Sequence, residues 1–319
     1  MKSPNEKYDM AVLLAFFNPC DSKRILMNFL YTFNWIKRQG IPVYGIELTF
    51  EGQQPSISDS NVIHVSSNSY FFHKERLYRL LEPHIPEKYT KLLFLDADVY
   101  YKESIWYDVI STSLDTNECV QAYETLKYLD LSYKHVHKVM KTCMLNPDEF
   151  YNVNYATGLS WAMQRSYYNT TGFYDYCIVG NSDLISVMHF VGKTLPEEEA
   201  LEQIFRLHEY KYKEYIQCPP PKSIDYCKLT AYHLYHGSLE NRQYWNRNFI
   251  FNSIDSNVHK LITTNKDGVF EWKTKELSDT WNPVMLNYFK SRCDDDISLE
   301  CIDIEVTFVQ KKSEDSESI

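Results

Sequence analysis

A short apolar run that stops at two carboxylates constrains the fold of this chain more than any other stretch. Leu92 to Leu95 are followed by Asp96, Ala97 and Asp98, and the run has the length of a buried strand rather than a helix. Open α/β sheets place their ligands beyond the carboxyl ends of such strands. Two carboxylates there suit Mg²⁺ or Mn²⁺, and either ion can hold a diphosphate. A solvated turn after a core strand explains this segment equally well.

The chain before this run has the pattern of a β-α-β unit. Apolar runs predict one strand at Met10–Phe17 and a second at Pro42–Thr49. Between them, apolar residues recur at helical spacing after a capping residue, Asp21 or Ser22, and Gly40 ends the pattern. Such a unit builds the parallel sheet of nucleotide-binding proteins. No Gly-x-Gly-x-x-Gly follows the first strand, which argues against a dinucleotide-binding fold.

The rest of the chain alternates between strand and helix patterns. Strands are predicted at residues 61–66, 155–163 and 229–236. Helices are predicted at residues 73–81, 126–144, 183–192 and 196–215, and residues 105–114 are helical or irregular. Together these elements predict the α/β class, with a mostly parallel central sheet flanked by helices.

Composition narrows the class of protein. Of the 319 residues, 44% are hydrophobic and 24% are charged, which is the balance of a soluble globular protein. The formal net charge of −10 argues against non-specific nucleic-acid binding, which needs clustered Lys and Arg. No apolar run is long enough to span a membrane and no signal peptide is recognisable, so we expect a cytoplasmic protein. The eight cysteines lack zinc-site spacing, so we expect free thiols.

Four stretches together are far more specific than the carboxylate pair alone. They are His73–Leu77, Phe94–Asp98, Thr157–Ala162 with its continuation to Asp183, and Tyr232–Gly237 followed by Arg242, Tyr244 and Arg247. In this order they resemble metal-dependent glycosyltransferases of the GT-A fold, similar to those of bacteria and large DNA viruses. The resemblance covers about residues 11–272 and is strongest from residue 96 to residue 247.

The resemblance implies a division of the chain into parts. Residues 8–247 would form one GT-A catalytic domain, with a Rossmann-like nucleotide-sugar-binding half at 8–120 fused to an acceptor half at 121–247. Residues 248–312 would form a C-terminal extension packed on this domain. Residues 313–319 would form a disordered acidic tail.

For the metal, the resemblance implies carboxylate ligands and one imidazole. Asp98 would bind Mn²⁺ or Mg²⁺ directly, and Asp96 would contact the metal through its water, or the donor ribose; both point to one side of an extended segment. His236 would be the third ligand, with His233 as the competing candidate, because residues three apart in a strand face opposite sides. We choose His236 because Gly237 behind it allows close approach of the backbone to a phosphate. An imidazole ligand favours Mn²⁺ over Mg²⁺.

Cationic side chains near these ligands would bind the donor diphosphate. Arg242 and Arg247 follow the histidines within one or two helical turns, and a guanidinium can bind two phosphate oxygens at once. Lys74 and Arg79, in the N-terminal region of a predicted helix, are further candidates for the nucleotide or diphosphate. A role in surface salt bridges would account for Arg242 and Arg247 equally well.

Three more residues are assigned to the donor by position alone. Phe17 and Asn18 end the first strand, where the nucleobase lies in this fold, and Glu47 near the end of the second strand would contact the base or ribose. The run Asp294–Asp296 lies outside the resembling region, and we expect it to be a solvated turn.

Asp183 is the expected catalytic base. In the family, an acidic residue at the start of the helix after the strand of Trp161 and Ala162 often faces the acceptor hydroxyl. A carboxylate near a helix N-terminus stays ionised, as a base must, and a base at this place implies an inverting reaction. The alternative is a plain helix cap, since Asn181, Ser182 and Asp183 are all good capping residues.

The expected protein is an Mn²⁺-dependent glycosyltransferase that moves a sugar from a nucleotide-diphosphate sugar, a UDP-sugar being favoured, to a hydroxyl of a glycan or another acceptor. Two other classes stay open. One is a non-catalytic protein that binds nucleotide sugars or carbohydrates on the same fold. The other is a metal-dependent phosphohydrolase, in which the aspartate pair normally ends the first strand rather than about the fourth. Metal-dependent release of a nucleoside diphosphate is expected only of the first class.

Overall fold

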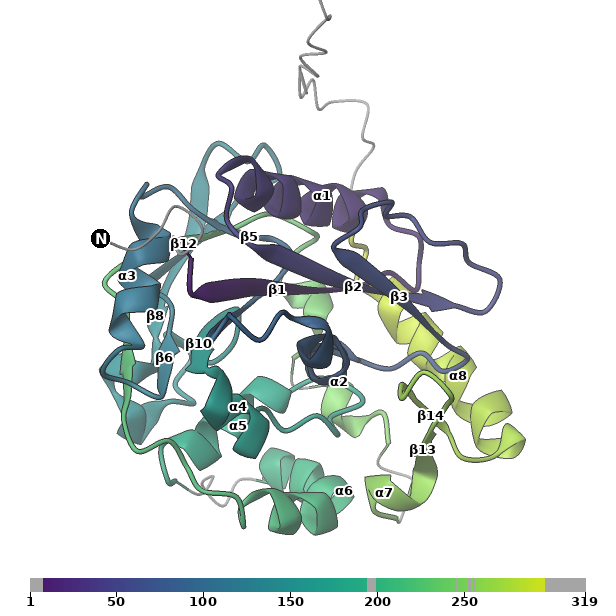
Figure 1. Cartoon of the computed structure of the whole chain (residues 1–319). Helices are drawn as coiled ribbons and strands as arrows, with labels where there is room; N and C mark the ends of the chain where they lie inside the picture. Colours follow the sequence, from purple (N-terminus) through teal and green to yellow (C-terminus); the bar gives the residue numbers. More distant parts are fainter. Residues whose placement is uncertain (1–7, 194–198, 245, 252–253, 255, 296–319) are drawn as a thin grey trace, which may run out of the picture.

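The computed structural model of the chain describes residues 8–193, 199–244, 246–251, 254 and 256–295. A central sheet crosses the molecule, with α1 (Lys23–Arg38) on one face and α2 (Lys74–Leu81) on the other (Figure 1). The predicted α/β class, with a mostly parallel sheet flanked by helices, is therefore confirmed.

The central sheet follows the spatial order β11-β6-β10-β4-β1-β2-β3. Its strands are β1 (Met10–Phe17), β2 (Val43–Phe50), β3 (Val62–Ser67), β4 (Lys91–Leu95), β6 (Cys119–Gln121), β10 (Ser160–Gln164) and β11 (Ile224–Tyr226). Neighbouring strands are parallel, except that β10 is antiparallel to both β4 and β6. The carboxyl ends of β1 and β4 therefore point to the same end of the sheet.

Alternating side chains of β1 build a core on each face of the sheet. Leu14 belongs to the core that contains Phe29 of α1, whereas Leu13 belongs to the core that contains Leu77 of α2. All four side chains are fully buried. A parallel strand that is covered on both faces must be apolar at every position, which explains the continuous apolar run in this part of the sequence.

A smaller sheet follows the order β5-β12-β7-β8-β9. Its strands are β5 (Val99–Tyr101), β7 (Thr125–Leu129), β8 (Val136–Thr142), β9 (Tyr155–Ala156) and β12 (Thr230–His233). Strand β12 pairs with β5, which follows Asp98 directly, so that His233 lies opposite Val99. This register brings a segment from late in the chain to the carboxylate pair.

Residues 126–144 were predicted as a helix and instead form the β7–β8 hairpin, so that prediction was wrong. The turn is fixed by Asp130, whose carboxylate accepts hydrogen bonds from the Ser132 hydroxyl and from the backbone amide of His135. The Tyr, Val and Thr residues of the segment favour strands over helices. Because β8 is mostly exposed, its sequence shows no clear alternation of apolar and polar residues.

Further helices cover the sheets and the C-terminal part. They are α3 (Trp106–Ser113), α4 (Arg165–Thr170), α5 (Ser182–Phe190), α6 (Glu199–Tyr215), α7 (Val258–Leu261) and α8 (Lys275–Ser291). Short 3-10 segments are η2 (Glu82–His84), η3 (Cys143–Leu145), η4 (Pro147–Glu149), η5 (Glu240–Arg242) and η6 (Asn246–Phe249). The helices predicted near α2, α5 and α6 are confirmed, and residues 105–114, predicted to be helical or irregular, contain α3. Ser22 caps α1 by accepting a hydrogen bond from the amide of Ile25.

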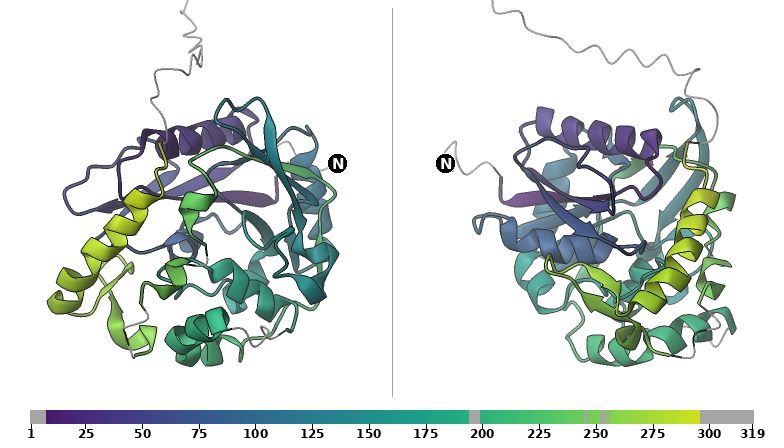
Figure 2. Two further views of the ribbon diagram at one scale, coloured as in Figure 1. Left: turned by 180° about the vertical axis from the view of Figure 1, so that it is seen from behind. Right: turned by 90° about the vertical axis from the view of Figure 1, so that its right-hand side faces the viewer.

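The C-terminal part returns to the central sheet. Strands β13 (Ile262–Thr264) and β14 (Phe270–Trp272) form a small hairpin, and α8 runs along the side of the molecule (Figure 2). Phe289 of α8 shares a buried core with Phe71, which precedes α2. The domain boundaries stay predictions, and the predicted acidic tail lies outside the described residues. Among the described helices, none has the length and apolar character needed to cross a bilayer.

Candidate functional site

A cleft of about 800 Å³ opens beyond the ends of β1 and β4. Its wall includes most of the predicted site residues, namely Phe17, Asn18, Lys74, Asp96, Asp98, Asp183, His236, Arg242 and Arg247. The fold thus gathers side chains from both ends of the predicted catalytic domain at the ligand-binding end of the parallel strands.

Asp98, His233 and His236 form a compact cluster in this cleft. His236 Nε2 lies 2.9 Å from Asp98 Oδ2, and His233 Nε2 lies 3.7 Å from Asp98 Oδ1. The two Nε2 atoms are 3.2 Å apart. All three potential ligand atoms lie within 4.8 Å of one another, a spacing that suits coordination of one metal ion.

The local backbone explains why both histidines reach Asp98. Strand β12 ends at His233, and the amide of Leu234 donates to the carbonyl of Asp98 at 2.7 Å. His236 lies beyond the strand and turns back to the same side as His233. The expectation that only one histidine could face the site was wrong, because it assumed an extended strand as far as His236.

The donor set of this cluster fits a divalent transition metal. Asp98 Oδ1 is buried and has no hydrogen-bond partner in the described part of the chain. Although burial opposes its charge, the facing His233 and His236 hold the pKa of Asp98 well below its usual range. Burial lowers the pKa of His233, which favours the neutral ring that a metal requires. Two imidazoles and one carboxylate suit Mn²⁺, Zn²⁺ or Fe²⁺ better than Mg²⁺.

Asp96 faces a different partner. Both of its carboxylate oxygens accept hydrogen bonds from the Lys74 ammonium, at 3.0 and 3.3 Å. Lys74 also lies 3.6 Å from Glu75, a largely buried residue that sequence reasoning missed. Burial raises the pKa of Asp96, although Lys74 opposes the shift. The structure therefore groups Asp96 with Lys74 rather than with the histidines, and its contact with a metal-bound water or with the donor ribose stays a prediction.

Asp183 lies in the first turn of α5, where Asn181 rather than Asp183 holds the cap position. The hydroxyl of Thr157 donates to Asp183 Oδ2 at 2.9 Å, and both side chains line the cleft. Gly158 is required for this arrangement, because a Cβ there would stand 2.6 Å from Asp183 Oδ2. The carboxylate is thus held in the cleft by a side chain of a neighbouring segment.

The described part of the cleft wall contains three arginines that are more than nine-tenths buried, Arg242, Arg247 and Arg292. Arg247 donates to Asn181 Oδ1 at 2.8 Å, and its guanidinium lies over the Phe72 ring. Arg292, which follows α8 and was not predicted, lies over the same ring. Burial and repulsion from Arg292 lower the pKa of Arg242 to about 10, so the guanidinium stays charged at neutral pH. This end of the cleft is suited to an anion.

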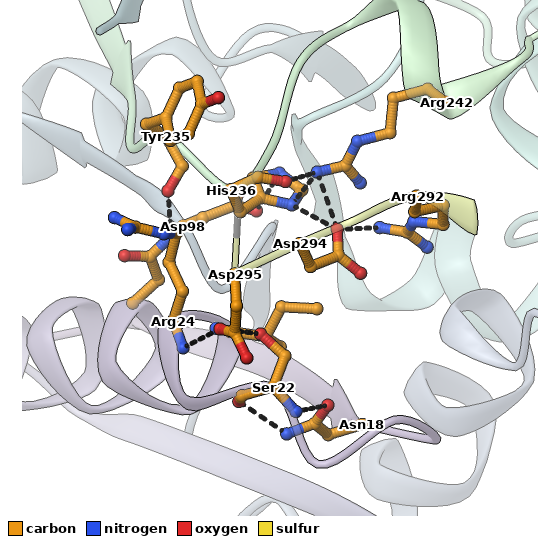
Figure 3. Close-up of polar contacts among 12 residues, drawn as sticks. Asn18, Ser22, Arg24, Asp98, Tyr235, His236, Arg242, Arg292, Asp294 and Asp295 are labelled. Atoms are coloured by element: carbon orange, nitrogen blue, oxygen red, sulfur yellow. Dashed lines mark hydrogen bonds and ion pairs between the residues drawn. The ribbon is translucent and has the colours of Figure 1, made fainter. Parts of the chain in front are cut away.

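The acidic run at residues 294–296 was predicted as a solvated turn; its two described residues do form a turn, but Asp294 is buried and Asp295 is half-buried. Asp294 is 7% exposed and forms ion pairs with Arg242 and Arg292 (Figure 3). Asp295 accepts a hydrogen bond from the hydroxyl of Ser22 at 2.7 Å. A run of three acidic residues carries no local signal that partners from distant segments neutralise it.

Two predicted donor-binding residues lie outside the cleft wall. The carboxylate of Glu47 accepts hydrogen bonds from the backbone amides of Ser56 and Ile57, at 2.7 and 3.1 Å, and the residue is 1% exposed. Arg79 pairs with Asp175 at 3.0 Å. Both predictions are corrected, because these side chains bind other parts of the fold and do not line the cleft.

Phe17 and Asn18 line the cleft and also have partners in the fold. The Phe17 ring packs edge-on against Phe72 and Phe289. Asn18 exchanges two hydrogen bonds with the backbone of Ser22, at 2.8 and 2.9 Å (Figure 3). These contacts hold the loop between β1 and α1 in one shape, and contact with a nucleobase stays a prediction.

No protein-family model matches the chain, and no curated protein sequence matches it. Solved structures with a similar backbone include the β1,4-galactosyltransferase 7 of Drosophila in complex with manganese, UDP-Gal and xylobiose, at 15% identity and a TM-score of 0.33. The match covers 59% of this chain and 63% of the Drosophila chain, so it spans less than two thirds of that protein.

The match to two other solved structures covers a larger share of their chains. The inositol-1-phosphate CTP transferase of T. maritima matches at 9% identity and a TM-score of 0.38, over 88% of this chain and 96% of that chain. A glycosyltransferase involved in glycosylation of the major capsid of PBCV-1 matches at 10% identity and a TM-score of 0.30, over 77% of this chain and 100% of that chain. Glycosyltransferases and nucleotidyltransferases both occur among the matches, and likenesses this low carry no argument about the reaction.

Proposed function

We propose that this protein is a metal-dependent glycosyltransferase that moves a sugar from a nucleotide-diphosphate sugar to a hydroxyl group of a glycan or another acceptor. The observation that carries the proposal is that the metal-ligand cluster of Asp98, His233 and His236 shares one cleft with the buried Arg242 and Arg247. A diphosphate leaving group gains negative charge as its bond to the sugar breaks, and it needs both kinds of partner.

Donor binding is assigned to the groups around this cluster. Asp98, His233 and His236 would hold Mn²⁺, which when bound neutralises part of the diphosphate charge. Arg242 and Arg247 would donate to phosphate oxygens, because a guanidinium presents paired N–H groups. A UDP-sugar is the first donor to test.

Asp96 and Lys74 are assigned to the part of the cleft that would hold the donor ribose. Asp96 would accept a hydrogen bond from the donor ribose, and its ion pair with Lys74 orients it for that contact. Lys74 also pairs with the neighbouring buried Glu75, so one ammonium reduces the repulsion between the Glu75 and the half-buried Asp96 carboxyl groups.

Asp183 is assigned as the base of an inverting transfer. The acceptor oxygen forms a bond to the anomeric carbon, and its proton moves to the Asp183 carboxylate. The bond from that carbon to the diphosphate breaks, and the electron pair leaves with the diphosphate. The hydrogen bond from Thr157 orients the carboxylate, which lies in the first turn of α5.

A thermal-shift screen of nucleoside diphosphates and their sugars, with Mn²⁺, Zn²⁺, Mg²⁺ or EDTA, tests donor binding. A ligand at a hundred times its Kd stabilises the folded protein by about 2.7 kcal/mol, which raises the melting temperature measurably. The donor that binds is then incubated with metal and an acceptor panel, and release of nucleoside diphosphate is measured. Release of inorganic phosphate would indicate a phosphohydrolase, release of pyrophosphate a nucleotidyltransferase, and binding without turnover a binding protein.

A further inference from the structure

The segment that follows α8 forms part of the cleft wall, although the function proposed above makes no use of it. Arg292 and Asp294 both line the cleft, and each is 7% exposed. Figure 3 shows this segment passing between the loop of His236 and the N-terminal end of α1. The C-terminal part of the described chain therefore contributes two charged, buried side chains to the candidate donor site.

Asp294 is a shared counter-ion within this site. Its Oδ1 atom lies 3.1 Å from Arg242 Nη2, 3.3 Å from Arg292 Nη2 and 3.6 Å from His236 Nδ1 (Figure 3). Arg242 also donates to the carbonyl of His236. One carboxylate is thus shared between two guanidinium groups directly behind the metal-ligand cluster.

In the part of the chain that the structure describes, the arginines at this end of the cleft have few negative partners of their own. Arg242 and Arg292 share the Asp294 carboxylate, and Arg247 donates to the neutral amide of Asn181. The Nε atoms of Arg247 and Arg292 are buried and have no hydrogen-bond partner in that part of the chain. Buried donors without partners are costly, and an anion with several oxygens would satisfy them.

Asp295 fixes the segment at its other side. Its carboxylate accepts hydrogen bonds from the Ser22 hydroxyl at 2.7 Å and from the backbone amides of Arg24 and Lys23, at 2.9 and 3.3 Å. A carboxylate is favoured at a helix N-terminus, which here belongs to α1. Through this contact the neighbouring Asp294 is held at a defined place in the cleft.

The loop after His236 is shaped to receive the segment. Gly237 has a φ of +91°, and a Cβ there would stand 3.0 Å from the carbonyl oxygens of both Arg292 and Cys293. The missing side chain of Gly237 thus allows close approach of the C-terminal segment, and close approach of its backbone to a phosphate stays a prediction.

We propose that the C-terminal segment completes the diphosphate site: Arg292 binds the donor diphosphate together with Arg242, and the Asp294 carboxylate occupies that anion position in the ligand-free protein. This inference rests on the proposed function, since it assigns further residues to the same donor site. The incoming diphosphate replaces one carboxylate with several phosphate oxygens, which also reach the unsatisfied Nε atoms. Asp294 then competes with the donor, so it lowers the apparent affinity for diphosphates.

The test is calorimetric titration of the full chain with inorganic pyrophosphate in EDTA, which isolates the arginine contribution from the metal. Asp294→Asn keeps the shape of the side chain and removes its charge, and we expect at least about tenfold tighter pyrophosphate binding. Arg292→Gln removes a phosphate partner, and we expect at least about tenfold weaker binding. Melting curves without ligand establish that each variant is folded.

Matched controls separate local contacts from overall charge. Asp279→Asn removes an exposed carboxylate from α8, and Lys290→Gln removes an exposed cation two residues before Arg292. Neither should change pyrophosphate binding by more than about twofold, because both side chains are exposed to solvent and salt, which screen their charges. The inference is overturned if Asp294→Asn binds no tighter than Asp279→Asn, or if Arg292→Gln binds as tightly as Lys290→Gln.

Failure of this inference can be told apart from failure of the proposed function. Suppose that the wild type releases nucleoside diphosphate in a metal-dependent way but both variants bind pyrophosphate as the wild type does. This result rejects only the role of the C-terminal segment. If no protein binds pyrophosphate and the wild type shows no nucleotide-dependent thermal shift, both proposals are rejected.

Discussion

The Nε2 atoms of His233 and His236 face each other at 3.2 Å beside the carboxylate of Asp98. Two neutral imidazoles repel each other if both present lone pairs at this distance, so either a proton or a metal ion must lie between them. In the protein without ligand, a neutral ring that carries its proton on Nε2 can donate to the other ring, and a bound metal ion would replace that proton. Substitution of one of the two rings is therefore the most direct test of the metal site.

Substitution of His233 by alanine should weaken metal binding strongly. Residues that only orient a ligand contribute 10–100-fold to metal affinity, and a direct ligand should contribute at least about as much. Titration with Mn²⁺, followed by calorimetry or by electron paramagnetic resonance, measures this affinity. His84→Ala removes an exposed histidine and is the matched control. Equal Mn²⁺ affinity of the two variants would remove His233 from the ligand set.

Asp183→Asn should lower turnover by about 10²–10⁴-fold while the affinity for the nucleotide sugar stays unchanged, because a general base acts on the acceptor proton and not on the donor. Asp108→Asn is the control, since Asp108 is an exposed aspartate in the first turn of α3. The measurements are kcat by nucleoside-diphosphate release and Kd by calorimetry. Unchanged kcat in Asp183→Asn would leave this carboxylate without a catalytic role.

The parts of the fold that were predicted correctly depend on neighbours in sequence. The strand before Asp96, the helix capped by Ser22 and the short helix at Asp183 each follow from spacing within a few residues. The end of β4 also places Asp96 and Asp98 at the ligand-binding end of a parallel sheet. Local pattern and general sheet topology were sufficient for these features.

The predictions that were wrong concern side chains whose partners come from distant segments of the chain. Nothing near Glu47 indicates that the amides of Ser56 and Ile57 will use its carboxylate. Likewise, nothing near Asp294 indicates that Arg242 will come to lie 3.1 Å away. Whether a charged residue faces solvent, a ligand or another buried charge is decided by tertiary packing, and a single sequence does not contain that information in readable form.

His233 illustrates an intermediate case. The sequence identified it as a candidate, and the strand argument then removed it because residues three apart face opposite sides. The argument failed only because β12 ends at His233 itself. Since strand ends are the least certain part of any sequence-based assignment, a choice between two ligands should not depend on such an end.

Glu47→Gln tests the correction of the predicted donor site. Loss of the charged acceptor for two backbone amides, of which that of Ile57 is buried, should cost about 1–3 kcal/mol of unfolding free energy, because Gln offers one oxygen where the carboxylate offered two. The affinity for nucleoside diphosphates should not change, since Glu47 does not line the cleft. Urea unfolding and nucleotide calorimetry measure the two quantities. A loss of nucleotide affinity at full stability would restore Glu47 to the donor site.

The stability of the fold should fall as the pH is lowered below about 6.5, and His208 should account for a defined part of the loss. His208 is buried in α6, and Tyr174 Oη lies 3.0 Å from its Nδ1. Burial lowers its pKa from 6.5 to about 3. Between these values the unfolded chain binds a proton that the folded chain does not, so stability decreases as pH falls through this window and is fully present above it. Between pH 7.5 and pH 5 the contribution is about 2 kcal/mol.

The measurement compares urea unfolding of the wild type with that of His208→Asn at pH 7.5 and pH 5. The variant should be less stable at pH 7.5, because packing against Tyr174 is lost, but its stability should fall less on acidification, by about 2 kcal/mol. Buried His73, whose pKa burial lowers to about 4, acts in the same direction and is present in both proteins, so it cancels in the difference. His84→Asn, at an exposed site, should keep the pH dependence of the wild type. Identical pH dependence of His208→Asn and the wild type would show that His208 takes up its proton in the folded state as readily as in the unfolded chain.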